Sequence, residues 1–146
     1  MITIRAATTE DIPAVLALWS AATVEPSATD DADGVATLLA VDPQSLLLAV
    51  GDDGALVGTV VAGWDGWRAT MYRLAVLPAR RRQGIARQLV DEGERRLRAN
   101  GARRFHLIVV ADEAPAQAFW AAAGYEQQQD RLRYVKTFAP QEAERG

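Results

Sequence analysis

The sequence predicts a single α/β (α+β) domain, in which a mixed and mostly antiparallel sheet of six to seven strands has helices on both faces. Its 146 residues match the usual size of one domain. Hydrophobic residues make up 49% and charged residues 24% of the chain, which is typical of globular proteins and argues against disorder. Strand-like and helix-like segments follow one another in the order β-α-α-β-β-β-α-β-α-β-β. We therefore expect one domain over residues 1–140 and a polar tail over 141–146.

The first third of the chain predicts one strand and two helices. Hydrophobic and polar residues alternate over 2–6, which indicates a strand. Thr8 or Thr9 can cap the helix that follows. The predicted buried face of that helix has the spacing i, i+3, i+4, i+7 and consists of Ile12, Val15, Leu16 and Trp19. Residues 23–34 are acidic and rich in turn formers, so we expect a mobile acidic segment before a short helix near 35–40.

The middle of the chain predicts three strands and a long helix. Residues 45–51 and 55–63 have strand composition and are joined by a tight Asp-Gly turn, and a third strand over 68–77 ends at a proline. From Gly84 the period changes, and apolar or small residues recur every four positions up to an Asn-Gly stop at 100–101. These residues are Ile85, Leu89, Gly93 and Leu97.

The last third predicts a buried strand, a short helix and a closing hairpin. The run over 103–110 is continuously apolar after its two arginines, which predicts burial on both faces. Residues 115–123 begin with proline and are followed by glycine, as expected for a short helix. Residues 125–129 and 131–138 are expected to pair as a hairpin, which completes the predicted sheet.

The net charge of -3 combines two segments of opposite charge. Residues 7–53 contain no Lys or Arg and nine acids: Glu10, Asp11, Glu25, Asp30, Asp31, Asp33, Asp42, Asp52 and Asp53. Residues 80–104 contain three acids and nine arginines, at positions 80, 81, 82, 87, 95, 96, 98, 103 and 104, a balance of +6. The basic segment therefore predicts an anionic ligand, and the acidic segment fits a cationic one.

The absence of cysteine excludes disulfides, thiolate metal sites and a cysteine nucleophile, and it fits a reducing cytoplasm. The first residues lack the pattern of a signal peptide, and no apolar run is long enough to span a bilayer, so we expect a soluble cytoplasmic protein. No metal is expected. The acidic run at 30–33 lacks the spacing of a calcium loop, and His106 is interpreted as a satisfied residue of a buried strand.

The most informative segment is LAVLPARRRQGIARQLV, residues 74–90. A helix start presents unpaired backbone N–H groups and a positive dipole end, which together can bind an anion. Gly84 and Ala86 remove bulk at this start, while Arg81, Arg82 and Arg87 add positive charge. A basic, solvated helix start would have the same residues. These physical features alone leave an anion site and a solvated helix start equally open.

The pattern Arg81-x-x-Gly84-x-Ala86, after a strand and before an amphipathic helix, resembles the acetyl-CoA motif of the Gcn5-related N-acetyltransferase (GNAT) superfamily. The order of elements over residues 2–138 is also similar, and FWAAAGY resembles a second motif of the superfamily. Small bacterial members have a Gly-aromatic-Asp-Gly turn like the one at residues 63–66. The chain is therefore identified by resemblance as a small bacterial single-domain member.

The resemblance implies a splay between the fourth strand, at 70–77, and the fifth, at 103–110, with the pantetheine arm of acetyl-CoA in the gap. The pyrophosphate would lie over the amides of residues 82–87, and an amide near Val76 would polarise the thioester carbonyl. The side chains of the fourth strand remain candidates for plain core packing. The implied cofactor-binding residues are Leu74, Ala75, Val76, Arg81, Arg82, Gln83, Gly84, Ile85, Ala86 and Arg87.

The implied reaction is direct attack of a primary amine on acetyl-CoA in a ternary complex. An amine with a pKa of about 10.4 is mostly protonated at neutral pH, at a cost of about 4 kcal/mol, so a base or a desolvating pocket must help. The superfamily often has an acid just before the LAV segment, where this chain has Tyr72 and Arg73. Glu25 is the remaining candidate base, or simply an exposed acid, and Tyr72 lies in the cleft or packs in the sheet.

The implied general acid also departs from the superfamily. The tyrosine that usually protonates the leaving thiolate is replaced by Trp120, and an indole N–H can donate a hydrogen bond but is no useful proton source. Glu113 occupies the position of a common asparagine. Either solvent and hydrogen bonds assist the thiolate, whose pKa is near 8.5, or Tyr125 serves as the acid. Core packing is the alternative interpretation of both aromatic residues.

Three functions remain after the sequence is read. The first is an acetyl-CoA-dependent N-acetyltransferase for a small-molecule or protein amine, without membrane or nucleic-acid partners and as a possible homodimer. The second is an acyl-CoA-binding regulatory domain with little or no turnover, suggested by the missing tyrosine and strand acid. The third interprets the arginine cluster as a nucleic-acid surface, which predicts strongly salt-dependent binding.

Overall fold

The computed structural model describes residues 1–22 and 27–141 of the chain. It divides into two compact units, Met1–Val110 and Ala111–Gly146, and each is described by itself below. Among the described residues, no helix is both long and apolar enough to cross a membrane. The same part of the chain contains no group of three or more His, Cys, Asp or Glu side chains that could hold a metal ion.

The first unit is built on one mixed sheet in which, over the described residues, five strands follow their order in the chain. Neighbouring strands are antiparallel except the last pair, which is parallel. The strands are β1 (Thr3–Ala6), β2 (Leu46–Val50), β3 (Leu56–Trp64), β4 (Ala69–Val76) and β5 (Phe105–Leu107). The first four lie where the alternation of residues and the turn signals predict them.

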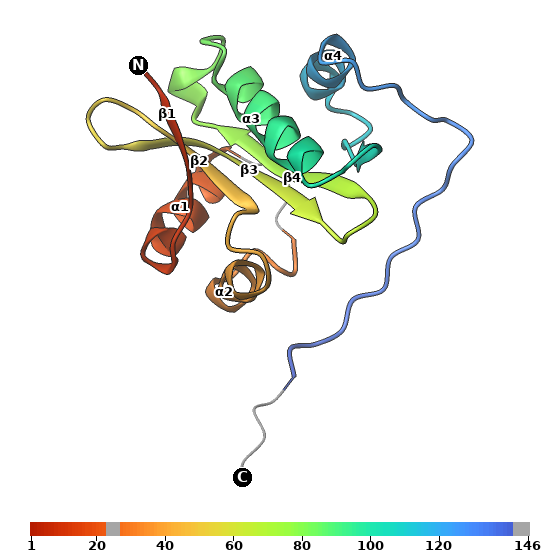
Figure 1. Ribbon diagram of the computed structural model, residues 1–146, viewed down its shortest axis with the longest axis horizontal. Coiled ribbons are helices and arrows are strands. Elements are labelled where there is room, and N and C mark those ends of the chain that lie inside the picture. The colour runs from red at the N-terminus through yellow and green to blue at the C-terminus, as the bar shows by residue number, and fades with distance from the viewer. Residues whose placement is uncertain (23–26, 142–146) are drawn as a thin grey trace. The chain divides into compact units, whose positions relative to one another are not determined.

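Helices cover both faces of this sheet, as predicted (Figure 1). α1 (Ile12–Ala22) and α2 (Ala32–Val41) lie on one side, and α3 (Ile85–Ala99) lies on the other. Single 3-10 turns at Thr9–Asp11 and Pro78–Arg80 lead into α1 and precede α3. The expected acidic loop is shorter than predicted, because α2 begins at Ala32 after an N-cap by Asp31.

The two faces have different cores. On the α1 and α2 side, Val15 and Leu46 are fully buried, and the indole N–H of Trp19 donates to the hydroxyl of Thr59 at 2.8 Å. On the α3 side, the helix approaches the sheet closely at Gly93, where a Cβ would stand 3.0 Å from Cε of Met71. A glycine at this position therefore lets α3 lie close against β3 and β4.

A β-bulge interrupts β4 between its two halves. Thr59 pairs with Ala75 and Val61 pairs with Tyr72. Between these two pairs β4 therefore contains one residue more than β3. The extra residue lies at Arg73, whose φ of 47° is in the left-handed region. The hydroxyl of Thr59 donates to the carbonyl oxygen of Arg73 at 2.9 Å. The bulge changes the direction of the β4 backbone immediately before the segment Leu74–Val76.

The predicted buried strand over 103–110 is wrong in length and in burial. Only Phe105–Leu107 forms a strand, paired with Ala69–Met71 of β4, and the side chain of Ile108 is 63% exposed. Strand composition does not fix how far pairing extends, because a strand also needs its backbone to lie alongside a neighbour. In the structure, β4 continues for five residues beyond the last pair, Met71 and Leu107.

The second unit contains α4 (Ala114–Ala122), close to the predicted helix at 115–123. The ring of Trp120 packs edge-on against Phe119 at 5.2 Å and Tyr125 at 5.0 Å between ring centroids. The helix ends before Gly124, whose φ is 95°. The predicted closing hairpin is absent, because residues 125–141 form no strand, so the described sheet has five strands rather than six to seven.

Candidate active site

The start of α3 is open for an anion. Gly84 precedes the helix with a φ of 79°, and the first helical hydrogen bond runs from the amide of Gln88 to the carbonyl of Gly84 at 3.1 Å. The amides of Ile85 and Ala86 therefore have no acceptor within the helix. A Cβ placed on Gly84 would meet no atom within 4 Å. A phosphate group needs unpaired backbone donors and room to approach them, and the start of α3 offers both.

Arginines surround this helix start from the preceding turn. Arg81 and Arg82 are exposed, and neither forms an ion pair with any described residue. Arg82 has a φ of 63°, and a guanidinium nitrogen of Arg81 donates to the carbonyl of Ala22 at 3.4 Å. Arg87 instead forms an ion pair with Asp91 at 3.0 Å. No described ion pair therefore offsets the charges of Arg81 and Arg82.

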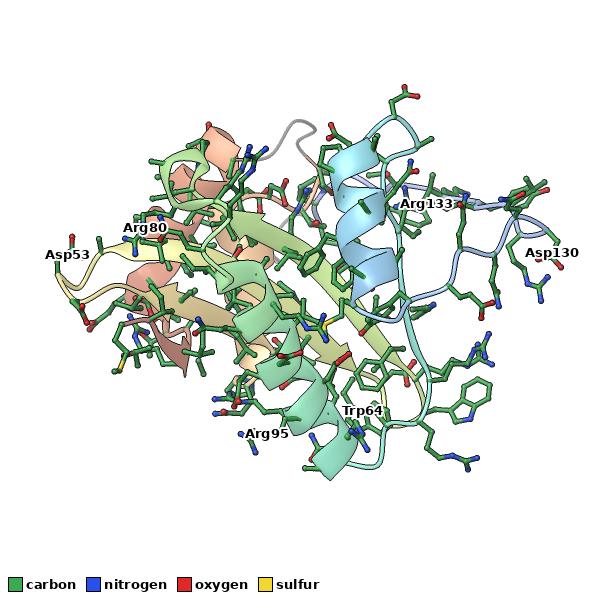
Figure 2. All side chains as sticks on the ribbon, turned by 90° about the horizontal axis from the view of Figure 1, so that it is seen from above. Asp53, Trp64, Arg80, Arg95, Asp130 and Arg133 are labelled. Atoms are coloured by element: carbon green, nitrogen blue, oxygen red, sulfur yellow. The ribbon has the colours of Figure 1, made fainter. Side chains whose placement is uncertain are left out.

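The basic segment 80–104 does not form one site. Figure 2 shows Arg80 near the start of α3 and Arg95 near its other end. A helix of 15 residues is about 22 Å long, so the two groups of arginines are well separated. Arg95 and Arg96 both bind Glu92, at 2.6 and 2.9 Å, and the hydrogen bond from Arg95 lowers the pKa of this carboxyl to about 2. Only the arginines before and at the start of α3 lie near the candidate anion site. This separation weakens the interpretation of the nine arginines as one nucleic-acid surface.

The second half of β4 has a free edge beside this helix start. Val76 pairs with Gly58 and Ala75 pairs with Thr59 on the β3 side, whereas pairing with β5 ends at Met71. Leu74 and Val76 are half-buried, and Ala75 is buried. Backbone groups on the β5 side of this segment are thus not used in a described strand pair, which leaves them for an extended ligand.

The structure describes three of the four predicted catalytic residues. Glu25 lies outside the described residues. Tyr72 lies on β4 next to the bulge, and its side chain is 55% exposed, so it does not pack in the core of the sheet. Trp120 is buried and Tyr125 is half-buried in the second unit, where their rings pack on each other. This contact agrees with the packing interpretation that the sequence left open for both.

Two side-chain pairs of the first unit were not predicted. Arg73 binds Asp30 through a bidentate ion pair, and His106 bonds to the hydroxyl of Thr70 at 2.7 Å. His106 lies in a strand as expected, but its side chain is exposed rather than buried. Neither pair has a local sequence signal, because the partners are 43 and 36 residues apart.

The Gly-aromatic-Asp-Gly turn has a structural role. The carboxylate of Asp65 accepts hydrogen bonds from the amides of Arg68 at 2.7 Å and Trp67 at 2.8 Å. These bonds lower the pKa of Asp65, the bond from Arg68 most strongly. Gly66 supplies the φ of 93° that the turn requires. The turn therefore connects β3 and β4 tightly and is not part of the anion site.

Comparisons with known proteins agree on one kind of protein. The family described as "Acetyltransferase (GNAT) family" matches residues 12–125. Acetyltransferase ECA0875 of Pectobacterium atrosepticum is 32% identical over 117 residues, which cover 80% of this chain and 82% of the relative.

Solved structures share the fold. The ribosomal-protein-S18-alanine N-acetyltransferase of Escherichia coli has a TM-score of 0.74 at 24% identity, and the match covers 94% of this chain and 85% of that one. The PaiA N-acetyltransferase of Thermoplasma acidophilum, solved with coenzyme A, has a TM-score of 0.75 at 15% identity, over 90% and 93% of the two chains.

The fold and the open helix start thus define an acetyltransferase. The chain belongs to the GNAT family, since the family match spans most of its length and a relative above 30% identity covers four fifths of it.

Proposed function

We propose that this protein transfers the acetyl group of acetyl-CoA to a primary amine by direct attack within a ternary complex. The observation that supports this best is the open start of α3, with Gly84 at a φ of 79° in front of unpaired amides. When bound, acetyl-CoA supplies an acetyl group already activated as a thioester. The cysteine-free sequence agrees with direct transfer, because no thiol is present to form an acyl-enzyme.

The residues of this chain fit the two ends of acetyl-CoA. The amides of residues 82–87 and the guanidinium groups of Arg81 and Arg82 would hold the pyrophosphate, with Gly84 leaving room for it. The free edge of Leu74–Val76 would pair with the pantetheine arm in a splay between β4 and β5. An amide near Val76 would stabilise negative charge on the thioester oxygen. A protein solved with coenzyme A shares this fold, which supports the assignment.

The proton transfers are assigned to the remaining candidates. Tyr72 is exposed beside the bulge, where its phenol can hydrogen-bond a water molecule that relays the proton of the amine to bulk solvent, and Glu25 is the alternative base, acting through water. The indole of Trp120 can donate a hydrogen bond to the leaving sulfur but cannot protonate it, so Tyr125 is the proposed acid of this pair. A thiolate with a pKa near 8.5 also leaves with solvent help alone.

The test is turnover against a panel of amines. Purified protein is incubated with acetyl-CoA and, in turn, a polyamine, an aminoglycoside, a lysine peptide and a peptide with a free N-terminus. Released CoA is titrated with a thiol reagent, and because the protein has no cysteine, every thiol detected comes from CoA. Mass spectrometry of the acceptor shows whether an amine gained the acetyl group. Tight binding of acetyl-CoA without turnover on any amine would refute the proposal and favour an acyl-CoA-binding regulatory domain.

A further inference from the structure

We propose that the ion pair between Arg73 and Asp30 positions the acyl-transfer site, by fixing the bulge of β4 and by holding the segment before α2 against it. This inference rests on the proposed acetyl transfer. It concerns two residues that sequence motifs did not select as functional, and it makes both of them positioning residues rather than catalytic ones.

The ion pair is bidentate and largely shielded from solvent. Nε of Arg73 donates to Oδ1 of Asp30 at 3.0 Å, and Nη2 donates to Oδ2 at 2.5 Å. The two side chains are only 23% and 13% exposed. The amide of Ser27 also donates to Oδ2 of Asp30 at 2.8 Å, and the amide of Asp30 donates back to the carbonyl of Ser27 at 3.0 Å. The carboxylate therefore ties the turn before α2 to the side chain of a β4 residue.

The backbone of Arg73 is held as firmly as its side chain. Its φ of 47° is unfavourable for a residue with a Cβ, so surrounding contacts must maintain it. The carbonyl oxygen accepts from the buried hydroxyl of Thr59 at 2.9 Å, and that hydroxyl accepts from the indole of Trp19 at 2.8 Å. Cζ of Arg73 also lies 5.8 Å from the centre of the Trp19 ring. Contacts from α1, β3 and the segment before α2 thus converge on one residue of β4.

The chemistry of the pair favours positioning over proton transfer. A guanidinium stays protonated at any physiological pH, so Arg73 cannot act as a base. Both carboxylate oxygens of Asp30 already accept hydrogen bonds from Arg73, and one accepts from Ser27 as well. Loss of the carboxylate charge would weaken this charge-assisted fork. The bulge stands directly before Leu74–Val76, so a change at Arg73 would tilt the amides proposed to receive the thioester.

The experiment compares Arg73→Lys and Asp30→Asn with a matched pair elsewhere in the fold. Arg73→Lys keeps the charge but removes the fork, and Asp30→Asn removes the charge with little change in shape. The control is the bidentate pair of Arg5 and Asp11, with both hydrogen bonds at 2.8 Å, which joins β1 to the turn before α1. Arg5→Lys and Asp11→Asn therefore perturb an equivalent contact on another part of the sheet.

Two measurements are made on each variant. Hydrogen exchange without ligand follows the amides of residues 27–31 and 72–76, and steady-state kinetics separates kcat from the KM for acetyl-CoA. We expect Arg73→Lys and Asp30→Asn to speed exchange in both segments and to lower kcat by about 10- to 100-fold, because small misplacements of reacting groups have effects of this size. The KM for acetyl-CoA should change less than about threefold, since the helix start is untouched. The control variants should leave both segments and kcat unchanged.

The outcomes separate this inference from the proposed function. Unchanged exchange in both segments, or faster exchange with kcat within about twofold of the wild type, would overturn the positioning role. A wild-type protein that binds acetyl-CoA but acetylates no amine would overturn the proposed function instead. In that case, faster exchange of both segments in the two variants would still support the coupling through the ion pair, and unchanged exchange would reject it.

Discussion

Replacing Gly84 by alanine tests the proposed phosphate site with little harm to the fold. The φ of 79° is unfavourable for alanine by about 1–2 kcal/mol. A Cβ at this position would meet no atom of the protein within 4 Å, so no collision adds to this cost. The added methyl group instead occupies open space at the start of α3, next to the amides proposed to bind the phosphate.

The expected loss is therefore mainly in affinity. A hydrogen bond to a charged group contributes about 1.5–3 kcal/mol, so disturbing one such bond should weaken acetyl-CoA binding by about 10- to 100-fold. Gly84→Glu adds a like charge next to the pyrophosphate, and we expect it to abolish measurable binding. Isothermal titration calorimetry with acetyl-CoA gives the affinity, and urea unfolding gives the free energy of unfolding of the same variants.

Gly54 provides the matched control. It lies in the turn between β2 and β3 with a φ of 80°, and a Cβ there would also meet no atom within 4 Å. Gly54→Ala should therefore cost the same stability while leaving acetyl-CoA affinity unchanged. Equal affinity of the Gly84→Ala and Gly54→Ala variants would refute the assignment of the phosphate site to the start of α3.

Three further predictions concern the stability of the first unit. The hydrogen bond from Arg5 lowers the pKa of Asp11 to about 2. Asp11→Asn should therefore lower the free energy of unfolding above about pH 4, and its difference from the wild type should fade as the pH drops toward 2. A difference in urea unfolding that does not change with pH would contradict this prediction. Trp19→Phe should cost about 1–3 kcal/mol by removing the buried bond to Thr59, and a loss below about 0.5 kcal/mol would show that the bond contributes little. Leu89→Ala should cost about 2–5 kcal/mol in urea unfolding, because Leu89 lies in α3 and its side chain is fully buried. Acetyl-CoA affinity should stay unchanged, and a loss of affinity as large as that of Gly84→Ala would contradict this prediction.

Several features of the protein could be predicted from the sequence because they are local. The alternation over β1, the turn signals that separate β2, β3 and β4, and the four-residue repeat of α3 all depend on residues close together in the chain. The open start of α3 was predictable for the same reason, since its backbone donors, its glycine and its arginines all lie within residues 74–90. The resemblance drawn from this segment and from the order of the elements is confirmed by the family match over residues 12–125.

Other predictions failed where pairing between distant segments decides the result. Local composition indicated strands over 103–110 and 125–138, yet only Phe105–Leu107 is paired in the structure. Strand propensity does not specify which sheet edge is free, and an unpaired strand leaves its backbone groups without partners. His106 lies in the paired part of this strand, opposite Thr70, and its side chain is nevertheless exposed.

The sequence by itself thus predicted the family, the first four strands, the helices that cover them and the open helix start that we propose binds phosphate. Only the tertiary structure decided the bulge of β4, the ion pair between Arg73 and Asp30, and the separation of the arginines onto the two ends of α3. The physical reason is distance along the chain: propensity and periodicity depend on near neighbours, whereas a bidentate pair spanning 43 residues exists only after the sheet has brought its partners together.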